Sequence, residues 1–344
     1  MSRLVATSVS PATSVQDAGR FGAQRYGLTP SGAMDGLSLV AANTLVGNAP
    51  FSAAIELGPL GSVLTARGGA VRIALAGAAR PASAGDRAIP WMSSTTLAEG
   101  ESLTIGVARG GVFSYLAVEG GIRGEPMFGS LAVNARAGLG SPFPRPLQAG
   151  DAIQVAPASR TTDRHLRLPV LAEQPIRVLL GPQDDEFGDA TRHFLDSEWR
   201  ISATSDRMGY RLEGPPIRHL HGHNIVSDGT VNGSIQVPGN GQPIVLMPDR
   251  GTSGGYPKIA TVISVDLGRL AQTQAGRAFR FRAVSMAEAQ AEFRARAELI
   301  RALPGRLADA QGTTLNVDAL QNANVAGTAI SAFDSEPITE DKYR

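Results

Sequence analysis

The sequence predicts a mainly β protein with two β-rich domains and one C-terminal helix, on three observations. Short runs of Val, Ile and Leu are separated by many of the 40 glycines and 22 prolines in 344 residues, which is typical of strands joined by turns. A polar, proline-bearing stretch interrupts this pattern at 158–174, and after Ser285 the apolar spacing becomes helical. We therefore expect domains at 1–165 and 166–285, then a C-terminal helix and polar tail at 286–344.

The first domain is predicted to consist almost entirely of short strands. Alternating or continuous apolar segments recur between Arg3 and Val155, and turn residues end each of them. Residues 35–46 are the exception, because Leu37, Ala41 and Leu45 recur at helical spacing. Asp35 precedes this stretch and is expected to cap the helix.

The second domain is predicted to open with a strand at 175–182 and a short helix at 184–195. Strands follow at a spacing typical of a barrel or sandwich. They are expected at 199–205, 209–214, 233–238, 242–248, 260–267 and 279–284. From 285 the alanine-rich segment favours a charged helix, on which Phe293, Ala297, Ile300 and Leu303 make an apolar stripe.

Composition excludes several classes of function. Lys plus Arg number 32 and Asp plus Glu 31, so the net charge of +1 gives no reason to expect a nucleic-acid or anionic-membrane partner. Cysteine is absent, which removes thiolate nucleophiles, disulfides and iron–sulfur ligation. The N-terminus lacks a signal-peptide core, and no apolar run is long enough to span a bilayer. We expect a cytoplasmic protein without a membrane span.

The common nucleotide motifs are also missing. There is no GxxxxGK[ST] loop and no strand–GxGxxG–helix unit, so neither a P-loop nor a Rossmann site is supported. Residues 251–255 match GxSxG, but Pro257 and a strand follow where a nucleophile elbow needs a helix. We therefore do not expect Ser253 to be a nucleophile.

The segment HLHGH places His219, His221 and His223 at alternate positions. On a strand such positions share one face and could reach one metal ion. No carboxylate stands at a matching spacing, and a solvated loop explains the same residues. We predict no metal, and the sequence leaves the role of this cluster open.

Three polar, glycine-rich segments are candidates for a binding site. Residues 249–258 (DRGTSGGYPK) combine a flexible, glycine-rich backbone with two cations. Arg250 is a bidentate donor and Lys258 is a point charge. Backbone N–H groups in such a loop can bind an anionic oxygen. The other two segments are 14–35 and 205–215. For each segment alone, a solvated turn or a strand entry explains the residues equally well.

Together the segments carry a more specific signal. The stretches TSVQDAGRFGAQRYGLTPSGAMDGLSLVAANTLVGN, SDRMGYRLEGP and GSIQVPGNGQPIVLMPDRGTSGGYPKIATVISVDLGRLAQ occur in this order. They resemble the allophanate hydrolase subunit 2 family, from about residue 7 to residue 284. That family includes KipA, the C subunit of prokaryotic 5-oxoprolinase, and the A and B parts of the carboxyltransferase region of urea carboxylase.

The resemblance implies that the second domain is a cyclophilin-like β-barrel. It also implies a KipI-like partner (allophanate hydrolase subunit 1) and, in a 5-oxoprolinase, a LamB/YcsF-like subunit. The implied cofactors are ATP, used by the complex, or carboxybiotin. The sequence contains neither the KipI-like half nor an AMKM biotinylation site, so we expect one subunit of an assembly that acts on a small amide.

Three positions depart from the family pattern. Asn232 stands before Gly233 where many relatives have proline, and Gly251 and Ser253 stand in DRGTSGGY where relatives are closer to DRQTTGGY. The missing glutamine at 251 removes an amide donor, so the substrate is expected to differ from that of the best-known members.

Both family chemistries act on an amide or ureido carbonyl whose oxygen gains negative charge, which donors in the site must stabilise. Arg250 with the glycine-rich backbone is the candidate donor, Asp206 or Asp17 is expected to orient a substrate N–H, and Tyr256 to close over a planar ring. The predicted catalytic residues are Arg250, Asp206 and Lys258. The predicted substrate-binding residues are Asp17, Arg20, Ser31, Asp35, Arg207, Tyr210, Gln236, Thr252, Gly254, Gly255 and Tyr256.

Three functions remain open at this point. The first is a subunit of an ATP-dependent 5-oxoprolinase-like amidohydrolase that acts on a cyclic amide with a KipI-like subunit. The second is half of a biotin-dependent carboxyltransferase that moves a carboxyl group to urea or a related amide. The third is a KipA-type regulatory protein that binds a kinase inhibitor.

Overall fold

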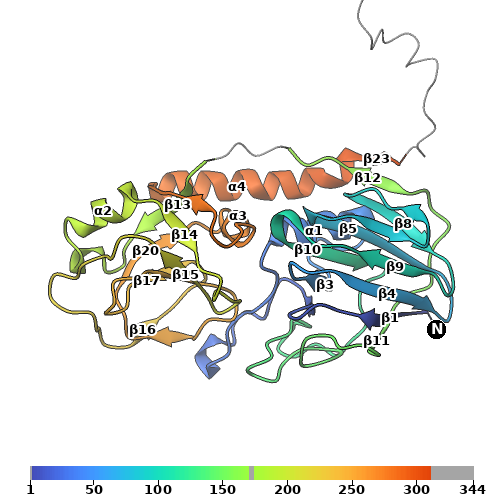
Figure 1. The fold of residues 1–344 in the computed structure, drawn as a ribbon, viewed down its shortest axis with the longest axis horizontal. Helices are drawn as coiled ribbons and strands as arrows, with labels where there is room; N and C mark the ends of the chain where they lie inside the picture. Colours follow the sequence, from blue (N-terminus) through green and yellow to red (C-terminus); the bar gives the residue numbers. More distant parts are fainter. Residues whose placement is uncertain (1, 170–173, 311–344) are drawn as a thin grey trace, which may run out of the picture. The chain divides into compact units, whose positions relative to one another are not determined.

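Two β-sheets pack face to face in the first half of the chain (Figure 1). The computed structural model describes residues 2–169 and 174–310, and the predicted tail beyond lies outside the described residues. The first sheet has six strands in the order β11 (Ala152–Gln154), β1 (Arg3–Ser8), β4 (Ser62–Arg67), β9 (Ser102–Ile105), β6 (Ala82–Ala84) and β7 (Arg87–Ala88). The second has seven, in the order β2 (Ser14–Gln16), β3 (Ala54–Leu57), β10 (Arg109–Val118), β5 (Val71–Ala79), β8 (Ser93–Leu97), β12 (Arg164–Leu166) and β23 (Leu307–Asp309).

The predicted helix of the first half is α1 (Gly36–Leu45), which packs on β5 and β10. Asp35 caps it as expected, because its Oδ1 accepts hydrogen bonds from the backbone N–H groups of Leu37 and Ser38, both at 3.2 Å. Residues 38–45 are all buried, since α1 lies between the seven-stranded sheet and the second half of the chain. The cap therefore satisfies two N–H groups of the first turn that have no partner within the helix.

The second half forms a nearly closed barrel. Eight strands follow the order β21 (Ala278–Phe279), β14 (Trp199–Ile201), β15 (Gly209–Glu213), β18 (Ile244–Leu246), β17 (Ser234–Gln236), β20 (Lys258–Val262), β13 (Ile176–Leu180) and β22 (Phe281–Ala283). The edge strands β21 and β22 are consecutive in the chain and separated by Arg280 alone, so covalent continuity brings the two edges together. Two short strands, β16 (Asp228–Gly229) and β19 (Ser253–Gly254), pair outside this sheet.

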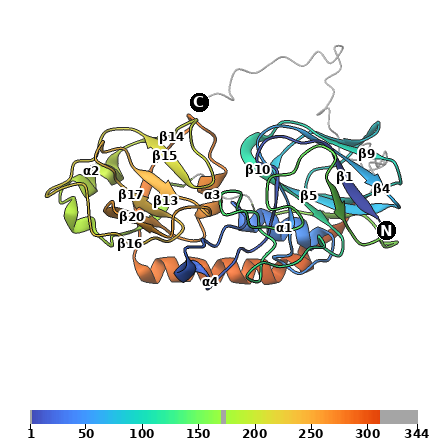
Figure 2. The same cartoon turned by 90° about the horizontal axis from the view of Figure 1, so that it is seen from below.

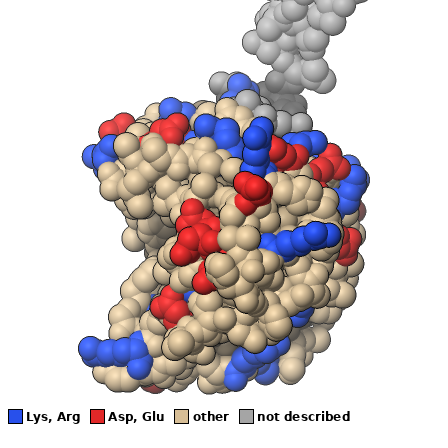
Figure 3. Space-filling view, turned by 90° about the vertical axis from the view of Figure 1, so that its left-hand side faces the viewer, with Lys and Arg blue, Asp and Glu red and all other residues tan. Residues whose placement is uncertain are grey.

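The predicted helix at 184–195 is split in two. A 3₁₀ turn, η2 (Asp184–Glu186), is followed by α2 (Ala190–Asp196), with Gly188 between them at a φ of +50°. That left-handed conformation interrupts an α-helix. Figure 3 shows the barrel face with acidic side chains grouped near its centre and Lys and Arg mostly toward its margins. The face therefore carries mixed charge.

Helix α4 (Met286–Ala302) is the C-terminal helix that the sequence predicts, and Figures 1 and 2 show it lying across both halves. Its N-terminus is a capping box between Ser285 and Glu288. Leu299 and Ile300 pack against the core, and the 3₁₀ turn η3 (Leu303–Arg306) buries Leu303 there. Phe293 belongs to the predicted stripe but is exposed. Strand β23, which the sequence does not reveal, then pairs with β12 of the first half.

The core explains how the halves stay together. One apolar cluster fills the space between the two sheets of the first half. A second joins residues of α1, β5 and β10 to the barrel interior, including Leu39, Tyr115, Trp199 and Ile259. Because this second cluster is shared, separating the halves would expose apolar surface on both. Residues of the two halves can therefore form one site.

Candidate functional site

Arg207 is the centre of a buried charge network between the halves. It lies in the turn before β15, and its Nε donates to Asp249 Oδ2 at 2.8 Å. Its Nη1 donates to Glu56 Oε1 on β3, and its Nη2 donates to the carbonyl of Gly32 at 2.7 Å. The guanidinium therefore connects the barrel to the first half through Glu56 and Gly32, while Asp249 holds it within the barrel half.

The network holds Arg207 in its charged form. Burial by itself would lower the pKa of Arg207, but the carboxylates of Glu56 and Asp249 raise it above its ordinary value. Burial, with Glu56 nearby, also raises the pKa of Tyr115 well above that of a free tyrosine. Its hydroxyl stays protonated and donates to Glu56 Oε2 at 2.6 Å. These groups supply one another's hydrogen bonds and balance one another's charges. Arg207 is therefore primarily a positioning residue, which holds the two halves together.

A cavity of about 560 Å³ lies beside this network, and we call it the Arg207 cavity. Both halves line it, and most of its walls are apolar or backbone. Its lining residues are Ala12, Gly58, Pro59, 111–113, 134–136, 201–203, 205–208, Tyr210, Asp249 and 273–275. Of the predicted site residues, Asp206, Arg207 and Tyr210 lie here. An apolar cavity of this size with a few polar groups is typical of small-molecule sites.

Asp206 and Tyr210 differ in what they can still bind. The hydroxyl of Tyr210 donates to the carbonyl of Ala271 at 3.0 Å, and burial raises the pKa of Tyr210, so that proton is already engaged. Asp206 Oδ1 accepts from the backbone N–H groups of Met208 at 2.8 Å and Gly209 at 3.3 Å. No hydrogen bond reaches its other oxygen within the described chain. Asp206 is thus held in place with a free acceptor.

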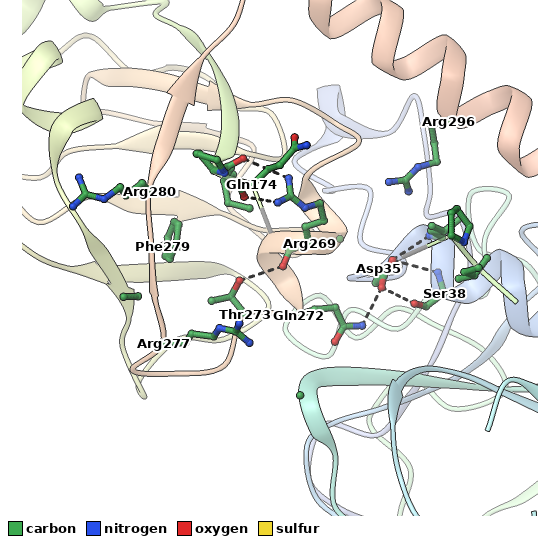
Figure 4. Close-up of a pocket in the computed structure, with 18 of the residues that line it drawn as sticks. Asp35, Ser38, Gln174, Arg269, Gln272, Thr273, Arg277, Phe279, Arg280 and Arg296 are labelled. Atoms are coloured by element: carbon green, nitrogen blue, oxygen red, sulfur yellow. Dashed lines mark hydrogen bonds between the residues drawn. The ribbon is translucent and has the colours of Figure 1, made fainter. Parts of the chain in front are cut away.

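A second cavity of about 740 Å³ contains Asp35, and we call it the Asp35 cavity (Figure 4). Asp35 Oδ2 accepts from Ser38 Oγ at 2.6 Å and from Gln272 Nε2 at 2.9 Å. Arg269 pairs with Asp266 at 3.1 Å, and Arg296 on α4 donates to the carbonyl of Val265 at 2.9 Å. The polar groups here are largely committed to the fold, and Asp35 acts as a helix cap.

Arg250 is buried near the glycine-rich loop and lines neither cavity. Its Nη2 makes long hydrogen bonds, at 3.4 Å to Gln24 Oε1 and 3.3 Å to the carbonyl of Thr230. Its Nε and Nη1 are buried without a partner in the described chain. Burial lowers the pKa of Arg250 below its ordinary value. Two donors of this guanidinium are therefore uncommitted.

The other predicted residues of this loop gather at the same end of the barrel. Lys258 Nζ is buried and pairs with Asp228 Oδ2 at 3.0 Å, and this bond lowers the pKa of Asp228. Gln236 Nε2 donates to the carbonyl of Tyr256 at 3.4 Å. A Cβ at Gly254 would collide with Gln236 Nε2, so a side chain there would require the Gln236 amide to shift. Thr252 and Gly255 are partly exposed, and Tyr256 is exposed.

The N-terminal segment packs behind the Arg207 cavity. Asp17 accepts hydrogen bonds from Gly19 N, Ser130 Oγ and Leu131 N at 2.7–2.8 Å, which fastens one loop to another. Arg20 donates to the carbonyl of Ala132, and its Nε and Nη1 are buried without partners in the described chain. Burial lowers the pKa of Arg20, with Asp17 and Asp249 opposing that shift.

Ser31 is tied to the cavity wall, because Asn134 Nδ2 donates to Ser31 Oγ at 3.1 Å. The predicted residues therefore fall into four places: the Arg207 cavity, the loops behind it, the Asp35 cavity and the glycine-rich end of the barrel. Sequence reasoning missed Glu56, Tyr115, Asn134, Arg136 and Gln272. Only Glu56 could have been recognised from the sequence, because it is a charged residue within an apolar strand. The others look like ordinary strand or loop residues.

The two alternative motifs have structural explanations. Ser253 lies in β19, and the next element along the chain is strand β20. His219 Nε2 bonds to the carbonyl of Val237 at 2.9 Å, and its ring packs on Phe187. Within residues 2–169 and 174–310, no three His, Cys, Asp or Glu side chains are grouped to hold a metal ion. No helix in those ranges is both long and apolar enough to cross a membrane.

Comparison with known proteins places this architecture in a family. Residues 26–283 match the family described as carboxyltransferase domain, subdomain A and B. The chain is 37% identical over 287 residues to the C subunit of 5-oxoprolinase from Haemophilus influenzae, covering 82% of this chain and 91% of that protein. It is also 37% identical to the corresponding C subunit from Escherichia coli, covering 80% and 90%.

A solved structure has the same fold. The urea amidolyase of K. lactis superimposes with a TM-score of 0.80 and 27% identity, over 87% of this chain. This chain spans only 20% of that much longer protein. The matched residues, the coverage and the shared fold together show that the chain belongs to the carboxyltransferase subdomain A and B family, which is the family of the 5-oxoprolinase C subunit.

Proposed function

We propose that this chain is a subunit of a cytoplasmic, ATP-dependent 5-oxoprolinase-like amidohydrolase, which opens a small cyclic amide together with a KipI-like and a LamB/YcsF-like subunit. The observation that carries the proposal is coverage: the chain matches 91% of the length of a 5-oxoprolinase C subunit at 37% identity. It matches only 20% of the urea amidolyase chain. A counterpart that is similar from end to end favours the same role in a complex.

The Arg207 cavity supports this proposal as the place for substrate. Its volume of about 560 Å³ accommodates a small ring, and Pro59, Val112 and Phe113 provide apolar wall. The Arg207 network fixes the barrel against the first half, so the cavity between them keeps its shape. Such preorganisation lets polar groups act on an amide without reorganising during the reaction.

Arg250 keeps its proposed role as the donor to the developing oxyanion. Its two uncommitted nitrogens support this role. Arg250 lines neither cavity, so contact with a substrate in the Arg207 cavity requires Arg250 to move in the assembled complex. Replacing Arg250 by alanine in that complex is expected to lower kcat about a hundredfold, which is typical for loss of one oxyanion donor. Unchanged turnover with intact assembly would remove Arg250 from the mechanism.

ATP is proposed to act at the level of the complex. Arg269 and Arg296 in the Asp35 cavity already bond to Asp266 and to the carbonyl of Val265, so nucleotide phosphates would fit this cavity only if these bonds were broken. We therefore assign no nucleotide contact to this subunit. When bound elsewhere in the complex, ATP would supply the driving force for opening a stable amide.

The test is reconstitution. The chain is co-expressed with its KipI-like and LamB/YcsF-like neighbours, and ATP-dependent release of glutamate from 5-oxoproline is assayed with each subunit left out in turn. We expect glutamate only when this chain is present. Glutamate release at the full rate without this chain, or none from a correctly assembled complex, would reject the proposal.

Carboxyl transfer from carboxybiotin to a urea-like amide is the second candidate, because the fold match to urea amidolyase extends over 87% of this chain. The assembled complex distinguishes the two. Transfer of labelled carboxyl from free carboxybiotin to urea, without glutamate release, would favour this candidate instead.

A further inference from the structure

Four charged side chains line the Arg207 cavity, and only two of them form ion pairs with other side chains. Arg207 and Asp249 pair with each other, and Arg207 also pairs with Glu56. The remaining two are Arg136 and Asp206, which come from opposite halves of the chain. Neither takes part in an ion pair within the described residues, and they do not pair with each other. Among the residues that the structure describes, the cavity therefore presents one free cation and one free anion.

Arg136 is a free side chain on a fixed backbone. Its turn is closed by the bridge between Asn134 and Leu139, and Asn134 Oδ1 accepts from Ala137 N at 3.1 Å. Asn134 Nδ2 also donates to Thr29 Oγ1 at 3.2 Å, which fastens the turn to the neighbouring loop. In contrast, the guanidinium of Arg136 makes no hydrogen bond to any described residue. A rigid turn that presents an uncommitted guanidinium to an apolar cavity fits an anionic ligand group.

Asp206 offers the complementary group. Two backbone N–H groups hold its Oδ1, so the carboxylate orientation is set by the turn that leads into β15. Its Oδ2 is an acceptor without a donor among the described residues. An amide N–H in the cavity could occupy that position. A ligand with a carboxylate at one end and an N–H donor at the other would therefore complement Arg136 and Asp206.

We propose that Arg136 binds the carboxylate of a small cyclic amide acid, while Asp206 Oδ2 accepts the hydrogen bond from its ring N–H. 5-Oxoproline has both groups on one five-membered ring, and its apolar methylenes suit the wall formed by Val112 and Phe113. This inference rests on the proposed amidohydrolase function and names the residues that select the substrate. Neutral amides such as urea lack the carboxylate and are expected to bind poorly.

The central experiment compares 5-oxoproline with its neutral analogue 5-oxopyrrolidine-2-carboxamide, in which the carboxylate is replaced by a carboxamide, in the reconstituted complex. Arg136→Ala is expected to raise KM for 5-oxoproline about tenfold to a hundredfold with little change in kcat, because it removes a charge-assisted bond made equally in the ground and transition states. KM for the carboxamide should change less than twofold. Arg136→Lys should lie between, since lysine keeps the charge but not the fork.

Two further variants sharpen the test. Asp206→Asn keeps an acceptor for Met208 N and Gly209 N but replaces the free acceptor by a donor, so it should raise KM for both analogues. Arg123→Ala is the matched control, because Arg123 is an exposed arginine of the first half that does not line the cavity. Its kinetics should equal those of the unchanged complex. Equal losses on both analogues in Arg136→Ala, or an unchanged KM, would overturn the assignment.

Equilibrium binding separates this inference from the proposed function. If the complex turns over 5-oxoproline but Arg136→Ala binds it normally, the inference is wrong and the proposed function stands. If the complex has no turnover but binds 5-oxoproline, and Arg136→Ala binds it at least tenfold more weakly, the site stands and the reaction is wrong. If the unchanged complex does not bind 5-oxoproline at millimolar concentration, both are wrong.

Discussion

Arg207 Nη1 donates a hydrogen bond to Glu56 Oε1 across 151 residues of sequence, and this bond ties the barrel to the seven-stranded sheet. Glu56 is fully buried and also accepts from Met34 N and Tyr115 Oη. A buried carboxylate needs such a complete set of donors, since desolvation penalises every unpaired charge. The pair is therefore expected to decide whether the two halves stay docked.

Arg207→Met should lower the free energy of unfolding by about 3–5 kcal/mol, because it leaves Glu56 and Asp249 buried without their shared cation. Adding Glu56→Gln removes one of those charges and should recover part of the loss. Urea unfolding of the single and double variants measures this coupling. Strictly additive effects would mean that the two side chains do not interact energetically.

Arg250→Met should behave in the opposite way. The Arg250 guanidinium is buried without an ion pair in the described chain, and two of its nitrogens lack partners there. Removing an uncompensated buried cation should leave the free energy of unfolding of the isolated chain unchanged or raise it by up to about 2 kcal/mol, as measured by urea unfolding. A loss as large as that of Arg207→Met would show that Arg250 has strong partners in solution.

Gly32→Ala tests the close approach of two loops. Gly32 has a φ of +89°, and a Cβ there would lie 2.8 Å from Gly19 N, a backbone atom that cannot move aside easily. The variant should lose roughly 2–5 kcal/mol through backbone strain and overpacking. Gly22→Ala is the control, because Gly22 has a φ of +82° with no atom within 4 Å of its Cβ position. It should lose only about 1 kcal/mol, as measured by chemical denaturation.

The ionisation of Asp266 should make the stability of the folded chain depend on pH. Burial would raise the pKa of Asp266, but the hydrogen bonds from Arg177 outweigh it and lower the pKa below the ordinary 3.8. A carboxyl whose pKa is depressed in the folded state stabilises the protein above the unfolded pKa and loses that contribution as pH falls through the folded value. The contribution should therefore be complete near pH 6, begin to fall as the pH approaches 3.8, and be lost as the pH falls through the lower pKa of the folded state.

The measurement compares Asp266→Asn with the unchanged chain between pH 7 and pH 2.5. The difference in unfolding free energy should be about 3 kcal/mol at pH 7 and shrink toward zero in acid. Asp163→Asn is the matched control, because Asp163 pairs with Arg72 but is 41% exposed, and its effect should stay below about 1 kcal/mol. A difference for Asp266→Asn that is independent of pH would contradict the assignment.

Much of the fold could be predicted from the sequence because the relevant signals are local. Asp35 caps α1 as expected, since a capping side chain needs only the next turn of backbone. Most of the barrel strands also lie within the predicted segments, because alternation of apolar residues marks a strand that buries one face. The limits of the domains and the substrate stay predictions.

The site depended on tertiary structure. Arg207 and Asp206 adjoin in sequence, yet one became a buried link to Glu56 and the other a cavity wall with a free oxygen. Arg136 gave no signal, because an arginine in a short loop is usually solvated. The sequence by itself determined most of the barrel strands, the helices α1 and α4, the Asp35 cap and the family. Only the folded chain decided which charges neutralise each other and which remain free, because electrostatic partners are set by distance in space and burial rather than by separation along the chain.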